Sequence, residues 1–172
     1  FIVDTPLVSW DYGTAYDMFV SLHMLHQPER YHIPATWASG MRSRLPGDAR
    51  ETLEQAEATV FDRRPTHWVY RLPPPKDGDT VLRALAAIPP LMRLPTLTLR
   101  PDTDPEVAVI LMDIAERGAW DSHDLTQFRT VYRRPQCADA ASVQDAAAIL
   151  SVWVDAAAFG ERFLTALTAY HE

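Results

Sequence analysis

The sequence predicts an all-α protein, and three observations support this fold class. Apolar residues recur at helical spacing in six segments, and no stretch alternates as a half-buried strand over more than five or six residues. The 14 prolines lie almost wholly between these segments, where they interrupt the chain. We therefore expect a helical bundle of about six to seven helices that ends in a long C-terminal helix.

The chain is predicted to form a single helical domain over residues 1–172. It is 47% hydrophobic, and a chain of this length can bury a full core without disulfides or a structural metal. No internal repeat or low-complexity linker divides it. One domain is therefore the expected count.

The first three helices are predicted in the N-terminal third of the chain. Residues 11–26 place their apolar side chains on one stripe, and a proline follows the segment. The second helix begins at Pro34, a residue suited to a first helical turn. The third covers residues 48–61, with Asp48 as a candidate N-cap and Glu51 at capping-box spacing.

Two extended segments and three helices are predicted in the middle of the chain. Residues 67–72 are rich in strand-forming types and precede three prolines, and residues 96–99 form a second short extended piece. A helix over residues 79–88 stops at a proline pair. A strongly apolar helix opens at Pro105 and ends at a glycine in the C′ position, and the third opens at Asp121.

The last predicted helix covers residues 142–170 and is unusually long. It carries two apolar seams, and two seams need two partners. We expect one seam to pack on the domain and the other to contact a second protomer or a further domain, through Ile149, Trp153, Phe163, Leu167 and Tyr170. Two alternatives remain: a central helix covered on both faces by its own chain, or a kink at Gly160 that gives two shorter helices.

The charge balance argues against direct contact with nucleic acid. The net charge is −7, and such a surface repels phosphates on average. Residues 34–61 have the outline of a helix-turn-helix, but the second helix presents Asp48, Glu51, Glu54 and Glu57, with Glu54 and Glu57 on its exposed face. DNA contact is therefore expected only through a segment that this chain does not contain.

The sequence indicates a cytoplasmic protein without a membrane segment. The longest aliphatic run, residues 107–112, is far shorter than the roughly 20 residues that a membrane helix needs. No signal-peptide pattern opens the chain, and the lone Cys137 cannot form an internal disulfide.

Three histidines are the strongest candidates for site chemistry. His23, His26 and His32 lie within ten residues, so a metal-binding helical enzyme is one hypothesis, although packed or capping histidines explain the pattern more simply. No nucleophile elbow, dinucleotide fingerprint or P-loop occurs, and we predict neither catalysis nor a cofactor. A pocket for a small apolar ligand is predicted between helices, with Tyr16, His23, His26, Trp37 and Trp153 as its candidate residues.

Short motifs in the first 46 residues resemble a known family. They are residues 8–11, residues 16–25 from Tyr16 to Leu25, residues 28–32, Thr36-Trp37, and residues 42–46. Together they resemble the N-terminal domain of long ArsR-like bacterial transcriptional regulators. That resemblance implies a helical domain whose long last helix leads into a C-terminal winged helix-turn-helix. The Cys pair that senses metal in ArsR proteins is missing from this sequence.

The resemblance implies the regulatory and dimerisation part of a bacterial transcriptional regulator, acting as a homodimer. The sequence begins at Phe1 rather than Met and stops at Glu172 within a predicted helix, so we expect a piece of a longer protein. A helical protein-interaction module remains an alternative, as does the metal-binding enzyme that uses His23, His26 and His32.

Overall fold

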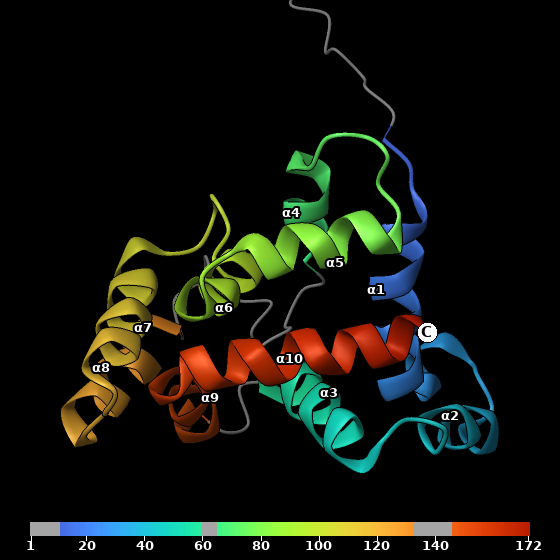
Figure 1. Cartoon of the computed structure of the whole chain (residues 1–172). Helices are drawn as coiled ribbons and strands as arrows, with labels where there is room; N and C mark the ends of the chain where they lie inside the picture. The colour runs from blue at the N-terminus through green and yellow to red at the C-terminus, as the bar shows by residue number, and fades with distance from the viewer. Residues whose placement is uncertain (1–10, 60–64, 133–145) are drawn as a thin grey trace, which may run out of the picture.

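A computed structural model describes residues 11–59, 65–132 and 146–172, and all regular structure in these ranges is helical (Figure 1). The ranges contain ten α-helices and one short 3₁₀-helix, more helices than the sequence predicts. Their bounds are α1 Thr14–His26, η1 Pro28–Tyr31, α2 Ala35–Arg42, α3 Gly47–Thr59, α4 Thr66–Arg71, α5 Gly78–Ala87, α6 Pro90–Thr98, α7 Pro105–Arg117, α8 Ser122–Tyr132, α9 Ala146–Val154 and α10 Ala156–His171. Cys137 and the first residues of the predicted last helix lie outside the described ranges. None of the described helices combines the length and the apolar character needed to cross a membrane.

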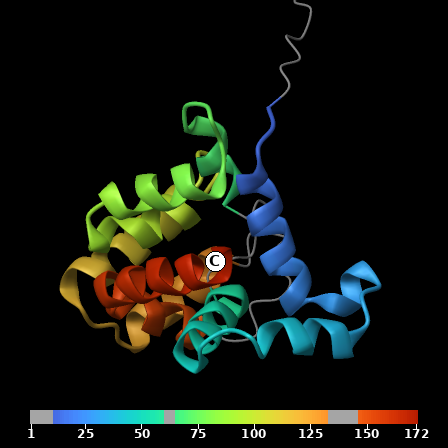
Figure 2. The ribbon, with the colours of Figure 1, turned by 45° about the vertical axis from the view of Figure 1, so that its right-hand side comes forward.

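Helix α10 lies at the centre of the molecule and organises its core. It packs on α6 and α5 along one side and on α3 along the other (Figure 1). Its buried side chains include Phe159, Phe163 and Leu167. A second group, formed by α7, α8 and α9, lies at the start of α10, while α1 and α2 flank its C-terminal end (Figure 2).

The prediction of one continuous helix over residues 142–170 is wrong. The chain turns at Asp155, so that α9 packs against α7 and α8 whereas α10 packs against α3 and α6. The apolar side chains of both predicted seams are thus divided between α9 and α10, whose neighbours belong to the same chain. The alternative of two shorter helices is correct, but the break lies at Asp155, and Gly160 lies inside α10. It is small for a different reason: a Cβ added there would come within 2.5 Å of the carbonyl oxygen of Pro90 on α6.

The seam predicted to contact a second protomer faces the interior of its own chain. Trp153, Phe163 and Leu167 are at most 2% exposed, and Ile149 and Tyr170 are half-buried against the same core. Ile149 and Tyr170 thus keep part of their surface, whereas the three buried side chains have none to offer a partner. A homodimer stays a prediction, and Trp153, Phe163 and Leu167 do not supply its interface.

Both segments predicted to be extended are helical. Residues 67–72 fall largely in α4, and residues 96–99 fall largely in α6, which contains Pro95. Strand propensity is a weak preference that depends on context. Here the burial of Trp68 on α4 and of Leu97 on α6 favours the helical arrangement, because each helix places an apolar side chain in the core.

The helix that opens at Pro105 confirms its predicted boundaries. The Asp104 carboxylate accepts a hydrogen bond of 2.9 Å from the backbone N–H of Glu106, which caps the first turn. Gly118 ends the helix with φ 66°, a left-handed conformation that favours glycine. Helices α2 and α3 begin within a residue or so of the predicted starts, and Asp48 lies in the first turn of α3.

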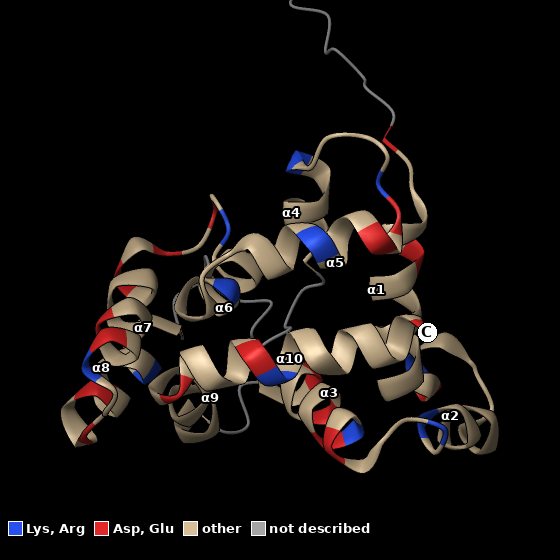
Figure 3. Cartoon of the chain, viewed as in Figure 1, with Lys and Arg blue, Asp and Glu red and all other residues tan. Residues whose placement is uncertain are grey.

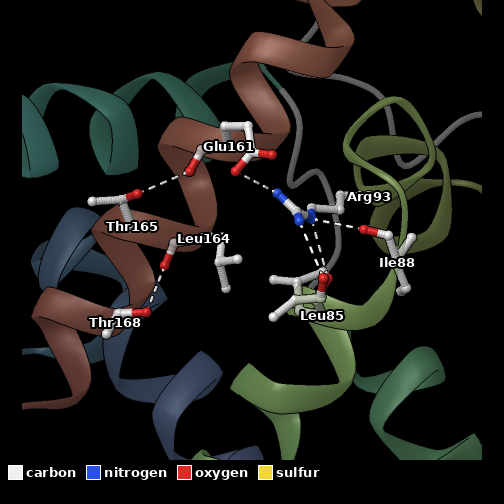
Figure 4. Close-up of polar contacts among 8 residues, drawn as sticks. Leu85, Ile88, Arg93, Glu161, Leu164, Thr165 and Thr168 are labelled. Carbon is white, nitrogen blue, oxygen red and sulfur yellow. Dashed lines mark hydrogen bonds and ion pairs between the residues drawn. The ribbon is translucent and has the colours of Figure 1, made fainter.

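A buried arginine joins three of the central helices (Figure 4). Arg93 on α6 is 5% exposed, and its Nε donates to the carbonyl oxygens of Leu85 and Ile88 at 3.1 and 3.0 Å. Its Nη2 donates to the carbonyl oxygen of Ala86 at 3.2 Å, and its Nη1 lies 2.9 Å from a carboxylate oxygen of Glu161 on α10. The guanidinium therefore satisfies the last carbonyls of α5 and links them to α10.

Candidate ligand-binding cleft

A cleft of about 670 Å³ lies where the C-terminal ends of α1 and α3 approach each other. Helix η1 and the last residue of α2 complete its walls. Figure 3 shows basic positions at the end of α2 and acidic positions along α3, so both signs of charge border the cleft. Its lining residues are His26, Gln27, Pro28, Glu29, Arg30, Arg42, Glu54, Glu57 and Ala58.

Glu57, which lines the cleft, forms a buried acid–histidine pair with His23 behind it. Nδ1 of His23 lies 2.6 Å from Oε2 of Glu57, and the two side chains are 5% and 7% exposed. The His23 ring also meets the edge of Tyr31, with ring centres 5.7 Å apart. A buried carboxylate needs charged or hydrogen-bonded partners. Among the described residues, the Glu57 carboxylate is paired with this histidine.

His26 contributes an acceptor that lacks a donor. Its Nδ1 lies 2.9 Å from the carbonyl oxygen of Leu22, and a carbonyl oxygen only accepts, so Nδ1 carries the proton. In the neutral ring Nε2 then keeps its lone pair. That nitrogen is buried and finds no hydrogen-bond partner in the part of the chain that the structure describes. The cleft thus combines a sparsely paired carboxylate with an unsatisfied acceptor.

Arg42, a basic residue that lines the cleft, is already engaged. Nη1 of Arg42 donates to the carbonyl oxygen of Leu25 at the end of α1, and its Nε lies 4.0 Å from Oε1 of Glu54. Both contacts hold α2 against the cleft walls. Arg30 and Glu29 lie at the exposed rim.

The cleft is connected to the central helix through a tyrosine. The hydroxyl of Tyr170, on the last turn of α10, donates to Oγ of Ser21 on α1 at 2.8 Å. Burial raises the pKa of Tyr170, and the negative charge of Glu57 raises it further, against the lowering effect of the Ser21 hydrogen bond. The hydrogen bond to Ser21 therefore ties the end of α10 to α1, the helix that also supplies the partner of Glu57.

Of the five predicted pocket residues, His26 lines this cleft, and His23 lies behind the wall as the partner of Glu57. Trp37 is 52% exposed on α2, and Trp153 is buried in the core at α9. Neither tryptophan lines the cleft, because one faces solvent and the other fills the core. The apolar pocket predicted from these side chains is therefore a charged cleft.

Tyr16 belongs to a different polar cluster near the start of α1. Its hydroxyl donates to the carboxylate of Asp11, and Nζ of Lys76 lies 2.5 Å from the same carboxylate. Lys76 is the chain's single lysine, is 8% exposed, and also donates to the carbonyl oxygen of Tyr70 at 2.6 Å. The hydrogen bond from Lys76 is the main cause that lowers the pKa of Asp11. This cluster fastens the start of α1 to the end of α4.

Sequence reasoning missed the acidic partner of the cleft. Glu54 and Glu57 were expected on the exposed face of the third helix, and Glu54 is exposed, but the Glu57 side chain is 93% buried. Its partner His23 is 34 residues away in the sequence, so no local spacing indicates the pair. The one available signal is that Glu57 follows Ala56, which lies on the buried face of α3.

The metal-site hypothesis gains no support from the structure. In residues 11–59, 65–132 and 146–172, no three His, Cys, Asp or Glu side chains are grouped so that they could hold a metal ion. Nδ1 of His23 and Nδ1 of His26 are engaged by Glu57 and Leu22, and His32 is exposed beyond η1.

A second hollow, of about 590 Å³, lies between α7 and α8. Its apolar side includes Val109, which is 67% exposed, and Val131, which is buried. Its polar side chains are all exposed, namely Glu106, His123, Thr126, Gln127 and Thr130. Because no buried polar group faces it, this hollow offers less to fix a ligand than the cleft does.

Comparison with protein-family models, with curated proteins and with solved structures finds no match to this chain. The resemblance to ArsR-like regulators therefore stays a prediction.

Proposed function

We propose that this chain is a ligand-sensing regulatory domain, which binds a small molecule in the cleft and transmits its occupancy through α10. The observation that carries the proposal is the arrangement around Glu57, whose side chain lies in the cleft wall and pairs with His23 of α1. The same helix holds the last turn of α10, because Ser21 accepts the hydrogen bond from Tyr170. The cleft volume is within the range of small-molecule sites.

Transmission requires that the ligand bind one arrangement of the helices better than another. A ligand that binds Glu57 shares this carboxylate with His23, and so alters the contact between α3 and α1. Tyr170 rests on Ser21 of α1, while α10 packs along α3. A shift of α1 relative to α3 therefore changes the packing of the last turns of α10.

The proposal extends to transcription through the family resemblance of the first 46 residues. We propose that the domain regulates a DNA-binding segment encoded after residue 172. The coding sequence itself tests this extension: a basic winged-helix segment downstream is the expected finding, and a stop codon directly after residue 172 contradicts it.

The sensing role is tested by blocking the cleft without disturbing the core. Ala58 lines the cleft and is exposed, so Ala58→Trp fills the space and leaves the buried face of α3 intact. Thr126→Trp is the matched control, since Thr126 is an exposed residue in the hollow between α7 and α8. The measurement is the thermal unfolding midpoint of each protein across a library of small metabolites.

At least one metabolite should raise the midpoint of the wild type and of Thr126→Trp but not that of Ala58→Trp. Binding to the folded state alone stabilises it, by about 2.7 kcal/mol at a hundredfold excess over the dissociation constant. If every stabilising compound acts equally on the two variants, the cleft is not the sensing site.

A further inference from the structure

We propose that the cleft binds the cationic end of an organic ligand, a primary ammonium, amidinium or guanidinium group, with Glu57 and His26 as its receptors. This inference rests on the proposed function and specifies its ligand class.

Two helix ends direct negative potential into the cleft. Helix α1 ends at His26 and helix α3 ends at Thr59, so the C-terminal ends of both helices border the same space. The C-terminus of a helix carries a partial negative charge. Glu57 adds a formal negative charge within the last turn of α3, at a position where a basic residue is the favourable choice.

The cations of the cleft do not compensate Glu57. Arg42 is committed to the carbonyl oxygen of Leu25 and approaches Glu54, and Arg30 is exposed at the rim. The Glu57 carboxylate pairs with Nδ1 of His23. A carboxylate has about four lone-pair sites, so one ring nitrogen leaves most of its capacity for another donor.

His26 supplies the second receptor group. Its Nδ1 is fixed by the Leu22 carbonyl, and its buried Nε2 is an acceptor without a partner among the described residues. A ligand that brought an N–H group to this nitrogen would satisfy it. Glu57 and His26 both accept hydrogen bonds, which selects a ligand group with several N–H donors and a positive charge.

An anionic ligand is the competing possibility, because Arg30 and Arg42 also line the cleft. An anion bound there would lie beside Glu54 and Glu57 and would receive no donor from His26. Arg30, exposed at the rim, suits at most an outer group of the ligand. The inner part of the cleft is therefore assigned to the cation.

Three probes of nearly identical shape separate these possibilities. Benzamidine is a cation, benzamide is neutral and benzoate is an anion, while the ring and the planar head group stay the same. Each is titrated to about 20 mM into the whole ¹⁵N-labelled chain near pH 7.5, where benzamidine is charged and a free carboxylate is ionised. Backbone amide shifts identify the site, and their concentration dependence gives the dissociation constant.

Benzamidine should shift the amides of Gln27, Arg30 and Ala58 and bind at least about tenfold more tightly than benzamide, with no saturable shift from benzoate. Glu57→Gln keeps the side-chain shape and removes the charge, and it should weaken benzamidine binding by about tenfold or more. Glu106→Gln, an exposed acid in the other hollow, is the control and should leave the dissociation constant unchanged.

The outcomes distinguish the ligand class from the sensing role. If benzoate or benzamide binds these amides as tightly as benzamidine, the cation assignment is overturned and the cleft remains a ligand site. If no probe shifts them, the cation assignment fails, and the metabolite comparison of Ala58→Trp with Thr126→Trp decides the sensing role separately. Should Glu57→Gln lose its folded spectrum, the wild-type comparison of the three probes still decides the ligand class, and Ala58→Trp, altered at an exposed position, tests the location.

Discussion

Two regions of the molecule each bury a charged side chain, but the two charges have different numbers of partners. One region is the junction of α5, α6 and α10, and the other is the cleft between α1 and α3. Arg93 is 5% exposed and has three backbone carbonyls and Glu161 around it. Glu57 is buried to a similar degree and is paired with His23 beside an open cleft. A buried charge that donates to several backbone carbonyls fastens elements together, whereas one with spare capacity beside a cavity is suited to binding.

The limiting case is a buried charge without any partner, and Trp153→Asp creates one. Trp153 is 2% exposed in the core, so this substitution removes a large side chain and places a carboxylate among apolar residues. We expect a loss of more than about 4 kcal/mol in the free energy of unfolding, enough to leave the chain largely unfolded. Circular dichroism and sedimentation check this expectation. If the wild type sediments as a dimer and the variant is a folded monomer, Trp153 belongs to a subunit interface instead.

Replacing the buried Arg93 gives the next largest effect. Arg93→Met retains much of the buried volume but leaves the last carbonyls of α5 without their donors, so we expect a loss of about 3 kcal/mol in urea unfolding. Glu161→Ala removes the partner that is 56% exposed, and should cost less than about 1 kcal/mol. Equal losses of unfolding free energy in the two variants would show that the ion pair, rather than the carbonyl contacts, stabilises the junction.

The close packing of the same junction is tested by a single methyl group. In Gly160→Ala the new Cβ meets the carbonyl oxygen of Pro90 at 2.5 Å, so α10 must move away from α6 at a cost of about 1 to 3 kcal/mol. Gly40→Ala on α2 is the control, because nothing lies within 4 Å of its added Cβ, and it should stabilise the protein by about 0.5 kcal/mol. Urea midpoints that move in the same direction for both variants would contradict this explanation.

The smallest expected effect on stability comes from His67, a half-buried histidine, and it depends on pH. Neither ring nitrogen of His67 has a hydrogen-bond partner within the described ranges, and burial, followed by the charge of Arg100, lowers its pKa. The unfolded chain therefore takes up this proton first, so the stability contribution is present above about pH 6.5 and is lost as pH falls through the folded-state value. His67→Phe should remove part of the difference between urea midpoints measured near pH 7.5 and pH 5.5. An unchanged difference would assign the acid sensitivity to other groups.

Local signals in the sequence predict the elements that are locally determined. Pro105 and Gly118 mark the ends of α7 because proline and glycine fix backbone geometry at those positions. The turn at Asp155 has no such signal, since it arises from the different neighbours of α9 and α10. Helix α4 likewise follows from the burial of Trp68, which overrides its strand-like composition.

The candidate site shows the same division. His23 and His26 are close in sequence, and their spacing on one helix indicates that they belong to one region. Glu57 and Arg42 reach the cleft from other helices, and only tertiary packing brings them there. An aromatic count predicted an apolar pocket at Trp37 and Trp153, because composition does not show that one side chain is exposed and the other fills the core.

The contrast between the two buried charges is tested most directly by urea unfolding. The wild type, Arg93→Met and Glu57→Gln are each measured with and without about 20 mM benzamidine. We predict that Arg93→Met loses about 3 kcal/mol and is still stabilised by benzamidine, as the wild type is. Glu57→Gln should lose about 1 kcal/mol or less and gain nothing from benzamidine. A Glu57→Gln protein destabilised as strongly as Arg93→Met, with its benzamidine response intact, would contradict the account.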